Sequence, residues 1–452
     1  MPKLIGNDLV AILPAWNAAT MKTLLPLFAH VAVISWHWAI AGEVPIGISN
    51  DEERQQHVKP QTKRSTLEPF VPGDLSVRDA ASGLLLSRGL SVRQLAQAGM
   101  PVAYTSSESS ASLSNLTFHT QPDGAAVFPL VGGGWVYLSN DEQEKFGRGG
   151  VYAVVFDADG EVLSYEQRLG KTTRNCGGGR TPHSTFISCE EYDRGRCHQI
   201  DPTGERKPRV TKLTGADGGS FESVTVDDRN TSSPVYFVTE DNLLGALRRY
   251  RPHPSVAKEG GWDSLHSDGG TLDYLEFFPN HTFTWTSDIA RGRRSAYYNY
   301  PNTEGIDFAN GRLYFVSKLY KTLYILDLTK NTYEIEFTNE GALLNDTGFA
   351  NSPDHVVTRG DLIFMTEDGG ASPGLFARNI TSGDYYTILE AWDESIYHDD
   401  EACGLAFSPD RRRLYLAFQE AGRLFEITRD DGKPFYGREL LLKSHRVKGR
   451  IE

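Results

Sequence analysis

Residues 313–327 read Leu-Tyr-Phe-Val-Ser-Lys-Leu-Tyr-Lys-Thr-Leu-Tyr-Ile-Leu-Asp. Two runs rich in aromatic and β-branched residues flank a short, partly polar segment, which is typical of a β-hairpin. Five further pairs of runs repeat this pattern along the chain. They are residues 136–139 with 151–157, 185–188 with 197–201, 235–238 with 247–250, 362–365 with 374–377, and 414–417 with 424–427. The sequence therefore predicts six related hairpins.

The hairpins recur at a nearly constant spacing. Measured between the second residues of their first runs, the separations are 49, 50, 78, 49 and 52 positions. The one long gap coincides with a Gly-, His- and Asp-rich insertion near residues 252–280. Blades of β-propellers have four strands and about 40–50 residues, whereas a long β-sandwich, the alternative, does not usually keep a fixed period. The pattern predicts an all-β fold, a six-bladed β-propeller over residues 116–432.

The composition limits the class of partner. The chain has 452 residues, 39% hydrophobic and 23% charged, with a formal net charge of -13. This is an ordinary globular composition. The negative charge argues against nucleic acid or an anionic membrane as the main partner, because both attract basic surfaces. Four cysteines are too few for a disulfide scaffold in a chain of this length. Cys189 and Cys197 could pair, but their spacing does not establish it.

The amino-terminal region carries the signature of a secretory signal peptide. Met21-Lys22-Thr23 precedes a largely apolar run that ends Ala39-Ile40-Ala41, a small-residue cleavage pattern. Residues 1–41 are therefore interpreted as an upstream extension and a signal peptide that starts at Met21. A single membrane anchor is the alternative, but Pro, His and Trp interrupt the run. Five glycosylation sequons also favour secretion. They begin at Asn115, Asn230, Asn280, Asn345 and Asn379.

The segments on either side of the predicted propeller look irregular. Residues 44–75 are polar and read as an extended linker, and residues 77–100 have a helix-like leucine spacing that glycines interrupt. We expect residues 42–115 to form an irregular N-terminal extension. Residues 433–452 are expected to form a basic C-terminal tail.

The innermost strand of each blade lines the axial channel of a propeller. Given strands of about five residues and short turns, it should precede each hairpin by roughly ten to fifteen residues. A residue that can bind metal falls near that window in every blade. These residues are Asp123, Cys176, Glu222, Glu304, Asp354 and Glu401. Converging carboxylates repel one another unless cations neutralise them, so the pattern predicts a metal site or a proton-sharing cluster.

Each of these residues also has a plain structural explanation. Acidic residues often cap turns, and Asp123, in Pro-Asp-Gly, is the clearest case. Cys176, in Asn-Cys-Gly-Gly-Gly, could be a small buried hydrophobic residue. A further set of acids at the ends of the first hairpin strands could be solvated or could bind calcium. These pairs are Asp141-Glu142, Glu190-Glu191, Glu240-Asp241 and Glu367-Asp368.

Residues 116–432 resemble the PhoX-type alkaline phosphatases. The most specific match is Asn175-Cys-Gly-Gly-Gly-Arg-Thr-Pro together with Ser188-Cys-Glu-Glu. Further motifs fit in order. They are Phe221-Glu-Ser-Val, Thr239-Glu-Asp, Thr303-Glu-Gly-Ile, Ser352-Pro-Asp-His and Phe407-Ser-Pro-Asp-Arg. The resemblance implies a secreted six-bladed propeller with an iron and calcium centre. By the same resemblance, Cys176 would be the iron thiolate, and the carboxylate ligands would be Glu191, Glu222, Glu304 and Asp354.

The sequence departs from the family pattern where substrate is bound. His183 replaces the usual Trp, Asn302 stands where an Arg is expected to hold phosphate, and Asn140-Asp141-Glu142 replaces Asn-His-Glu. The expected metal set is complete and the phosphate set is altered. Candidate substitutes for the phosphate contacts are Arg174, Arg180, His183 and Lys318, and the predicted catalytic residues are Arg174, Arg180 and His183.

Three functions are compatible with this sequence. The first is a secreted metal-dependent phosphatase that acts on a small phosphomonoester, with a metal-activated oxygen nucleophile in place of a Ser-His-Asp triad. The second is another propeller hydrolase or synthase, similar to the metal lactonases or to strictosidine synthase. The third is a non-catalytic propeller whose metals hold the blades together. Neither nucleic acid binding nor stable membrane insertion is expected.

Overall fold

The computed structural model describes residues 71–259, 261–338, 351–370 and 372–435. This part of the chain is built from antiparallel β-strands, and the prediction of an all-β propeller is confirmed. Blade one is β6 (Pro122–Pro129), β7 (Trp135–Asp141), β8 (Gly149–Phe156) and β9 (Val162–Thr172). Blade two is β10 (Asn175–Arg180), β11 (Phe186–Tyr192), β12 (Cys197–Ile200) and β13 (Arg209–Val210). Each predicted hairpin falls on the second and third strands of its blade.

The other four blades follow in chain order. Blade three is β14 (Gly219–Asp227), β15 (Val235–Glu240), β16 (Arg248–Arg251) and β17 (Thr271–Phe278). Blade four is β19 (Thr303–Ala309), β20 (Arg312–Ser317), β21 (Thr322–Asp327) and β22 (Thr332–Phe337). Blade five is β23 (Ser352–Arg359), β24 (Leu362–Asp368), β25 (Gly374–Asn379) and β26 (Tyr385–Ala391). Blade six is β27 (Ala402–Phe407), β28 (Arg413–Phe418), β29 (Arg423–Arg429) and β3 (Leu90–Gln97).

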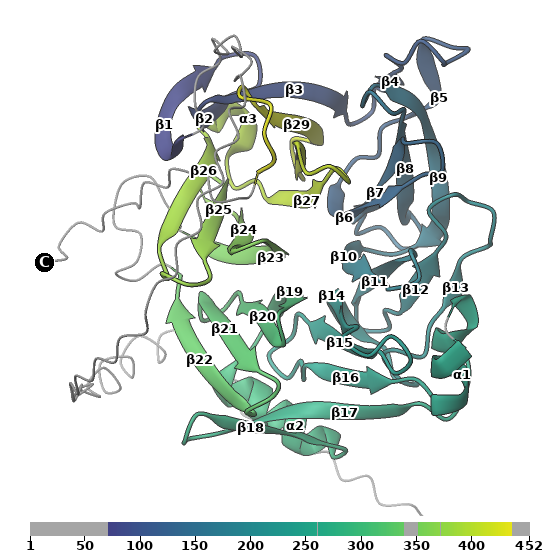
Figure 1. The fold of residues 1–452 in the computed structure, drawn as a ribbon, viewed down its shortest axis with the longest axis vertical. Helices are drawn as coiled ribbons and strands as arrows, with labels where there is room; N and C mark the ends of the chain where they lie inside the picture. Colours follow the sequence, from purple (N-terminus) through teal and green to yellow (C-terminus); the bar gives the residue numbers. More distant parts are fainter. Residues whose placement is uncertain (1–70, 260, 339–350, 371, 436–452) are drawn as a thin grey trace, which may run out of the picture. The chain divides into compact units, whose positions relative to one another are not determined.

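The six innermost strands form a closed ring. Each contacts the innermost strand of the next blade, in the order β6, β10, β14, β19, β23 and β27, and β27 in turn contacts β6 (Figure 1). The hydrophobic core lies between neighbouring blades. Val136 and Leu138 of blade one pack with Phe186 and Ile200 of blade two, for example. The second residue of every predicted hairpin is at most 1% exposed, which explains why a large apolar or aromatic residue recurs at this position. These residues are Tyr137, Phe186, Tyr236, Tyr314, Ile363 and Tyr415.

Residues 71–115, the described part of the extension expected for residues 42–115, form strands rather than an irregular segment. β3 is the outer strand of blade six, where Leu90 lies opposite Arg429 and Gln97 opposite Arg423. The ring is therefore closed by pairing strands from the two ends of the described chain. β1 (Val71–Asp79) and β2 (Leu84–Arg88) extend blade five, because β2 pairs with β26. β4 (Pro101–Ala103) and β5 (Leu113–Thr117) form a separate small sheet.

Glycine explains the misleading helix-like spacing of this region. Gly83 and Gly89 have φ of 77° and 86°, which places them in turns between strands rather than inside a helix. The leucines between them, Leu84 and Leu86, are buried against blades five and six. The spacing thus comes from short strands interrupted at each glycine.

The extra length of blade three lies on both sides of its outer strand. α1 (Pro254–Glu259) and the 3-10 helix η3 (Trp262–Leu265) precede β17, and β18 (Thr282–Thr286) and α2 (Ile289–Asn299) follow it. A further short helix, α3 (Glu394–Tyr397), leads into blade six. The predicted insertion near 252–280 therefore includes a true blade strand.

Cys189 and Cys197 form a disulfide between β11 and β12, where they are direct neighbours across the sheet. The predicted signal peptide, the sequon at Asn345 and nearly all of the basic tail lie outside the described residues. In the described ranges, no helix has the length and apolar character needed to cross a membrane.

Leu86→Ala tests whether the segment before the first blade is part of the folded ring. Leu86 is 1% exposed and lies opposite Leu389, so its truncation should lower the free energy of unfolding by about 2–5 kcal/mol. Urea denaturation followed by tryptophan fluorescence measures this change. The control is Leu116→Ala, because Leu116 is 44% exposed. An unchanged stability of Leu86→Ala would show that the segment is a dispensable arm.

Candidate metal centre

All six innermost strands carry a β-bulge at the same level. The pairing between the first and second strand shifts register at Pro122/Ala125, Asn175/Gly178, Phe221/Val224, Thr303/Ile306, Pro353/Val356 and Cys403/Ala406. A bulge bends a strand and changes the direction of a side chain. Here the bulges lie at, or within two residues of, the one metal-capable residue that the sequence assigns to each blade.

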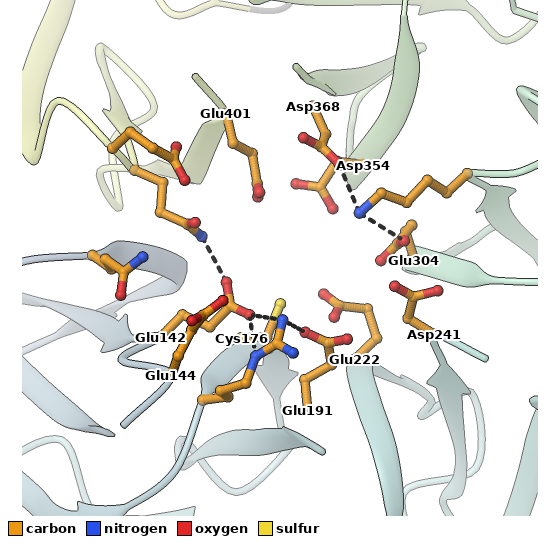
Figure 2. A pocket seen from close by; sticks show the side chains of 15 residues that line it. Glu142, Glu144, Cys176, Glu191, Glu222, Asp241, Glu304, Asp354, Asp368 and Glu401 are labelled. Carbon is orange, nitrogen blue, oxygen red and sulfur yellow. Dashed lines mark hydrogen bonds and ion pairs between the residues drawn. The ribbon is translucent and has the colours of Figure 1, made fainter. Parts of the chain in front are cut away.

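These residues converge on the axis of the ring. Figure 2 shows Cys176, Glu222, Glu304, Asp354 and Glu401 pointing from five different blades toward one cavity. Asp123, on β6, lies against them and is fully buried. One ligand atom from each of Cys176, Glu191 and Glu222 lies within 4.8 Å of the others, and the same holds for Glu222, Glu304 and Asp354.

Close backbone contact makes this convergence possible. Gly124 follows Asp123, and a Cβ on Gly124 would lie 2.6 Å from the carbonyl oxygen of Cys176. A Cβ on Gly305 would lie 2.4 Å from the backbone nitrogen of Val356. Both distances are shorter than any side chain tolerates. Glycine after the axial residue therefore lets neighbouring strands approach until their acids meet.

The cavity has a volume of about 230 Å³ and a strongly acidic lining. Among the described residues, ten carboxyl groups, one thiol and two cationic side chains line it. The carboxyl groups are those of Glu142, Glu144, Glu191, Glu222, Asp241, Glu304, Asp354, Asp368, Glu401 and Glu420. The cations are Arg174 and Lys318. The protein alone therefore does not balance the charge of these acids in their ionised form.

Both cations are already held by acids of the cavity. Arg174 Nη2 lies 2.9 Å from Glu142 Oε1 and 2.7 Å from Glu191 Oε2. Lys318 Nζ lies 2.7 Å from Asp368 Oδ2 and 3.5 Å from Glu304 Oε1. The Glu304 carboxylate is the main influence that raises the pKa of Lys318, so the ammonium group stays charged.

The environment of the other groups in the cluster disfavours their ionised forms. Burial, followed by the charges of Asp354 and Asp123, raises the pKa of Glu222 well above its usual range. Burial and then Glu142 raise the pKa of Glu191 to about 9. Burial also raises the pKa of the Cys176 thiol, with Asp123 the next cause. Without bound cations, burial therefore disfavours the ionised form of each of these groups.

Several buried oxygens in the cluster have no hydrogen-bond donor among the described residues. They are both carboxylate oxygens of Asp123 and of Glu222. Leaving buried acceptors unsatisfied costs free energy, so such groups point to something the protein chain does not supply. A thiol favours a transition metal and carboxylates favour a hard cation such as calcium. The donor set thus fits the iron and calcium that the resemblance implies.

Comparison with known proteins supports the fold. No family model and no curated protein matches the sequence. Among solved structures, Pseudomonas fluorescens PhoX in complex with vanadate is 14% identical, with a TM-score of 0.59 over 81% of this chain and 98% of that one. A gluconolactonase from Xanthomonas campestris is 14% identical, with a TM-score of 0.40 over 80% and 97%. The PQQ domain of pyranose dehydrogenase from Coprinopsis cinerea is 12% identical, with a TM-score of 0.45 over 76% and 97%. The chain thus shares the propeller fold with PhoX at a distant level.

The structure brings together most of the predicted site residues. Cys176, Glu191, Glu222, Glu304 and Asp354 all line the cavity, and so does Arg174. Their roles as ligands stay a prediction. Asn140 supports this arrangement, since its amide Nδ2 donates to the carbonyl oxygens of both Cys176 and Gly177 at 2.5 Å.

Arg180 and His183 do not line this cavity. β10 runs away from the acids, and four residues of strand separate Arg180 from Cys176 by about 13 Å. Arg180 instead lines a second cavity of about 240 Å³ with Arg359, formed by the other ends of the innermost strands. His183 lies in the turn between β10 and β11. The prediction that these two residues contact a substrate at the acidic centre is therefore corrected.

The structure also changes the interpretation of Asp123, which belongs to the acidic cluster rather than to a turn. Its Pro-Asp-Gly context suggested a turn cap, but Asp123 is fully buried in β6, and burial followed by Glu142 raises its pKa well above the usual range. Glu401 completes the ring from blade six. Its backbone forms an isolated antiparallel β-bridge with that of Asp368. The offset from the hairpins was the signal that identified both residues. Asn302, in place of the expected Arg, donates to Asp241 Oδ1 at 2.6 Å.

The metal-free protein should lose stability as the pH rises from about 5 to about 9. Unfolded carboxyl groups ionise near pH 4–4.5, whereas burial raises the folded pKa of Glu191 to about 9 and that of Glu420 to about 8. The folded chain then binds more protons than the unfolded chain across this window, so the free energy of unfolding falls with pH.

Urea denaturation at a series of pH values, with a chelator present, measures this slope. The control adds saturating calcium, which should flatten the slope because cations bind the ionised carboxylates. A metal-free stability that rises over the same window would contradict the burial of these acids.

Proposed function

We propose that this protein is a metal-dependent hydrolase that cleaves phosphomonoesters at the axial cavity, with iron and calcium as cofactors. The observation that supports it most is the Cys176 thiol beside converging buried carboxylates whose oxygens lack donors among the described residues. A thiolate next to hard oxygen ligands suits a mixed centre better than calcium alone. The distant fold similarity to a phosphatase is consistent with this assignment.

The expected iron site comprises Cys176, Glu191 and Glu222, and the expected calcium ligands are Glu222, Glu304 and Asp354. When bound, such cations neutralise phosphoryl oxygens and lower the pKa of a water molecule that can attack phosphorus. The residues of the protein orient the metal ligands and select the substrate. Arg174 fixes Glu142 and Glu191 by its two ion pairs, and so sets the direction of the Glu191 carboxylate.

Lys318 is the cation best placed to contact the substrate. Its Nζ lies on the cavity wall between Glu304 and Asp368 and keeps its proton. An ammonium group there can donate a hydrogen bond to a phosphoryl oxygen. Arg174 and Lys318 are already paired with acids of the cavity, so bound cations would supply most of the positive charge that attracts an anionic substrate, and phosphate binding should depend on metal loading.

The cellular setting belongs to the same proposal. We expect a secreted glycoprotein that acts on a small-molecule ester. The Cys189–Cys197 disulfide favours an oxidising compartment. The sequons at Asn115, Asn230 and Asn280 have exposed asparagines, as glycan attachment requires.

A lactone or another ester is the second candidate substrate, and one observation favours it. Asn302 occupies the position where phosphate-binding Arg is expected, and its amide is engaged by Asp241. Calcium without iron in the purified protein, together with turnover of lactones, would favour this candidate. Metals bound without turnover of any ester would instead indicate a structural role.

Cys176→Ser should remove iron and lower aryl phosphate hydrolysis by at least about 100-fold, because loss even of outer-shell metal partners costs 10–100-fold. Iron and calcium per chain, measured by elemental analysis beside the hydrolysis rate, test this result. The comparison variant is Cys403→Ser, which changes the other free thiol of the described residues. The Cys403 thiol donates to the Pro122 carbonyl oxygen at 2.9 Å and lies near Asp123 and Glu401, outside the proposed iron site, so this variant should keep its iron. Full iron content and activity in Cys176→Ser would refute the assignment.

A further inference from the structure

The end of the axial channel opposite the acidic centre holds a second cavity, with a volume of about 240 Å³. All six innermost strands contribute to its lining, each with residues that follow the axial residue of its blade. Among the described residues, none lines both cavities. The acidic centre and this second cavity can therefore bind different molecules.

Most of the wall of the second cavity is aliphatic. Val127, Val224, Ile306, Val356 and Leu405 come from five of the six innermost strands. Ligand sites in proteins are mostly apolar, carry a few polar groups that fix the orientation of the ligand, and span about 300–1,000 Å³ for drug-sized molecules. A cavity of this size and lining therefore suits a smaller molecule with an apolar body.

Two arginines from opposite sides of the ring reach this apolar cavity. Arg180 is the last residue of β10, and Arg359 is the last residue of β23. These strands are three positions apart in the ring of six, so they face each other across the channel (Figure 1). Burial, followed by the charge of Arg359, lowers the pKa of Arg180. The two like charges therefore lie close enough to repel each other at this end of the channel.

Aromatic rings, which carry no net charge, support both guanidinium groups. The guanidinium carbon of Arg180 lies 5.1 Å from the centre of the Phe128 ring, and that of Arg359 lies 5.3 Å from the centre of the Phe407 ring. Arg359 Nη1 also donates to the carbonyl oxygen of Thr358 at 2.6 Å. These contacts orient the arginines without neutralising them.

Two carboxyl groups line the cavity as well, but neither forms an ion pair with Arg180 in the described part of the chain. Asp307 accepts hydrogen bonds from Thr225 Oγ1 at 3.2 Å and from the N–H and Oγ1 of Thr358 at 2.6 and 2.7 Å. Its charge opposes the fall in the pKa of Arg180, but it ranks behind burial and the like charge. Asp228 is exposed to solvent. Positive charge is therefore left for an anionic ligand.

We propose that the second cavity binds a small organic carboxylate, with its carboxylate group between Arg180 and Arg359 and its apolar body against the aliphatic wall. Guanidinium groups match carboxylates by two parallel hydrogen bonds. An anion between the arginines also relieves their repulsion. The aliphatic wall favours an organic ligand over an inorganic anion, which has no apolar surface to bury. The site does not depend on phosphomonoester hydrolysis, because the acidic cavity holds none of its residues.

Isothermal titration calorimetry with benzoate on the full-length protein tests the proposal. Arg180→Gln and Arg359→Gln should each weaken benzoate binding at least about 10-fold, because each removes a hydrogen bond between charged groups. Benzamide, which has the same ring without the charge, should bind at least about 10-fold more weakly than benzoate. Equal affinities of benzoate and benzamide, or an unchanged benzoate affinity in Arg180→Gln, would overturn the proposal.

Arg206→Gln is the matched control. The guanidinium carbon of Arg206 lies 5.6 Å from the centre of the Trp262 ring, so it is also an arginine on an aromatic ring, but it lines neither cavity. This variant should keep the benzoate affinity of the parent protein. An equal loss of affinity in Arg206→Gln would indicate a general charge effect and overturn the site. Sulfate that binds as tightly as benzoate would contradict an organic ligand.

A measurement on the unaltered protein covers the case in which an arginine variant fails to fold. Crystals soaked in 4-bromobenzoate should show a bromine anomalous peak inside the second cavity. A peak confined to the acidic cavity, or no peak in either cavity, would overturn the proposal. A peak in the second cavity of a protein that is inactive toward phosphomonoesters would support this site and refute only the proposed function.

Discussion

Mutual repulsion among the axial carboxylates is the constraint on which the rest of the structure depends. Six blades each bring one acid or thiol to the ring axis, and further acids line the cavity behind them. The two nearby cations are already paired with Glu142, Glu191, Glu304 and Asp368. Such a cluster is tolerated only when it holds protons or binds metal ions. The unsatisfied oxygens of Asp123 and Glu222 favour metal ions, because a protonated acid normally donates to a neighbour.

The hydrophobic core supplies the stability that an acidic centre needs. Buried aromatic residues between neighbouring blades fix the orientation of each sheet, and β3 closes the ring by pairing with β29. Because the scaffold is held at the blade interfaces, the innermost strands can carry bulges and glycines without losing the fold. The two ends of these strands then differ in chemistry. One end gathers carboxylates, and the other places Arg180 and Arg359 around a separate cavity.

The fold was predictable because each blade repeats a local signal. A large buried residue, aromatic in five blades and Ile363 in the other, recurs in the second strand of each blade, and four of its five separations are 49–52 positions. The axial residue keeps a similar offset from it. The closing strand was not predictable, because the pairing of Leu90 with Arg429 spans most of the chain and leaves no local pattern. Gly83 and Gly89 concealed it further by giving short strands a helix-like spacing. Arg180 and His183 were predicted to replace altered phosphate contacts, but an extended strand carries residues after Cys176 away from the site. Asp123 shows the reverse case, where a typical turn sequence forms part of a bulge.

Anomalous X-ray diffraction from crystals of the protein tests the central claim most directly. Data collected at the iron absorption edge should show a peak about 2.3 Å from Cys176 Sγ, a bond length typical of metal–thiolate ligation. Long-wavelength data should show calcium about 2.3–2.6 Å from oxygens of Glu304 and Asp354. Crystals without anomalous peaks in the cavity, with the carboxyl groups joined only by protons and water, would contradict a metal centre.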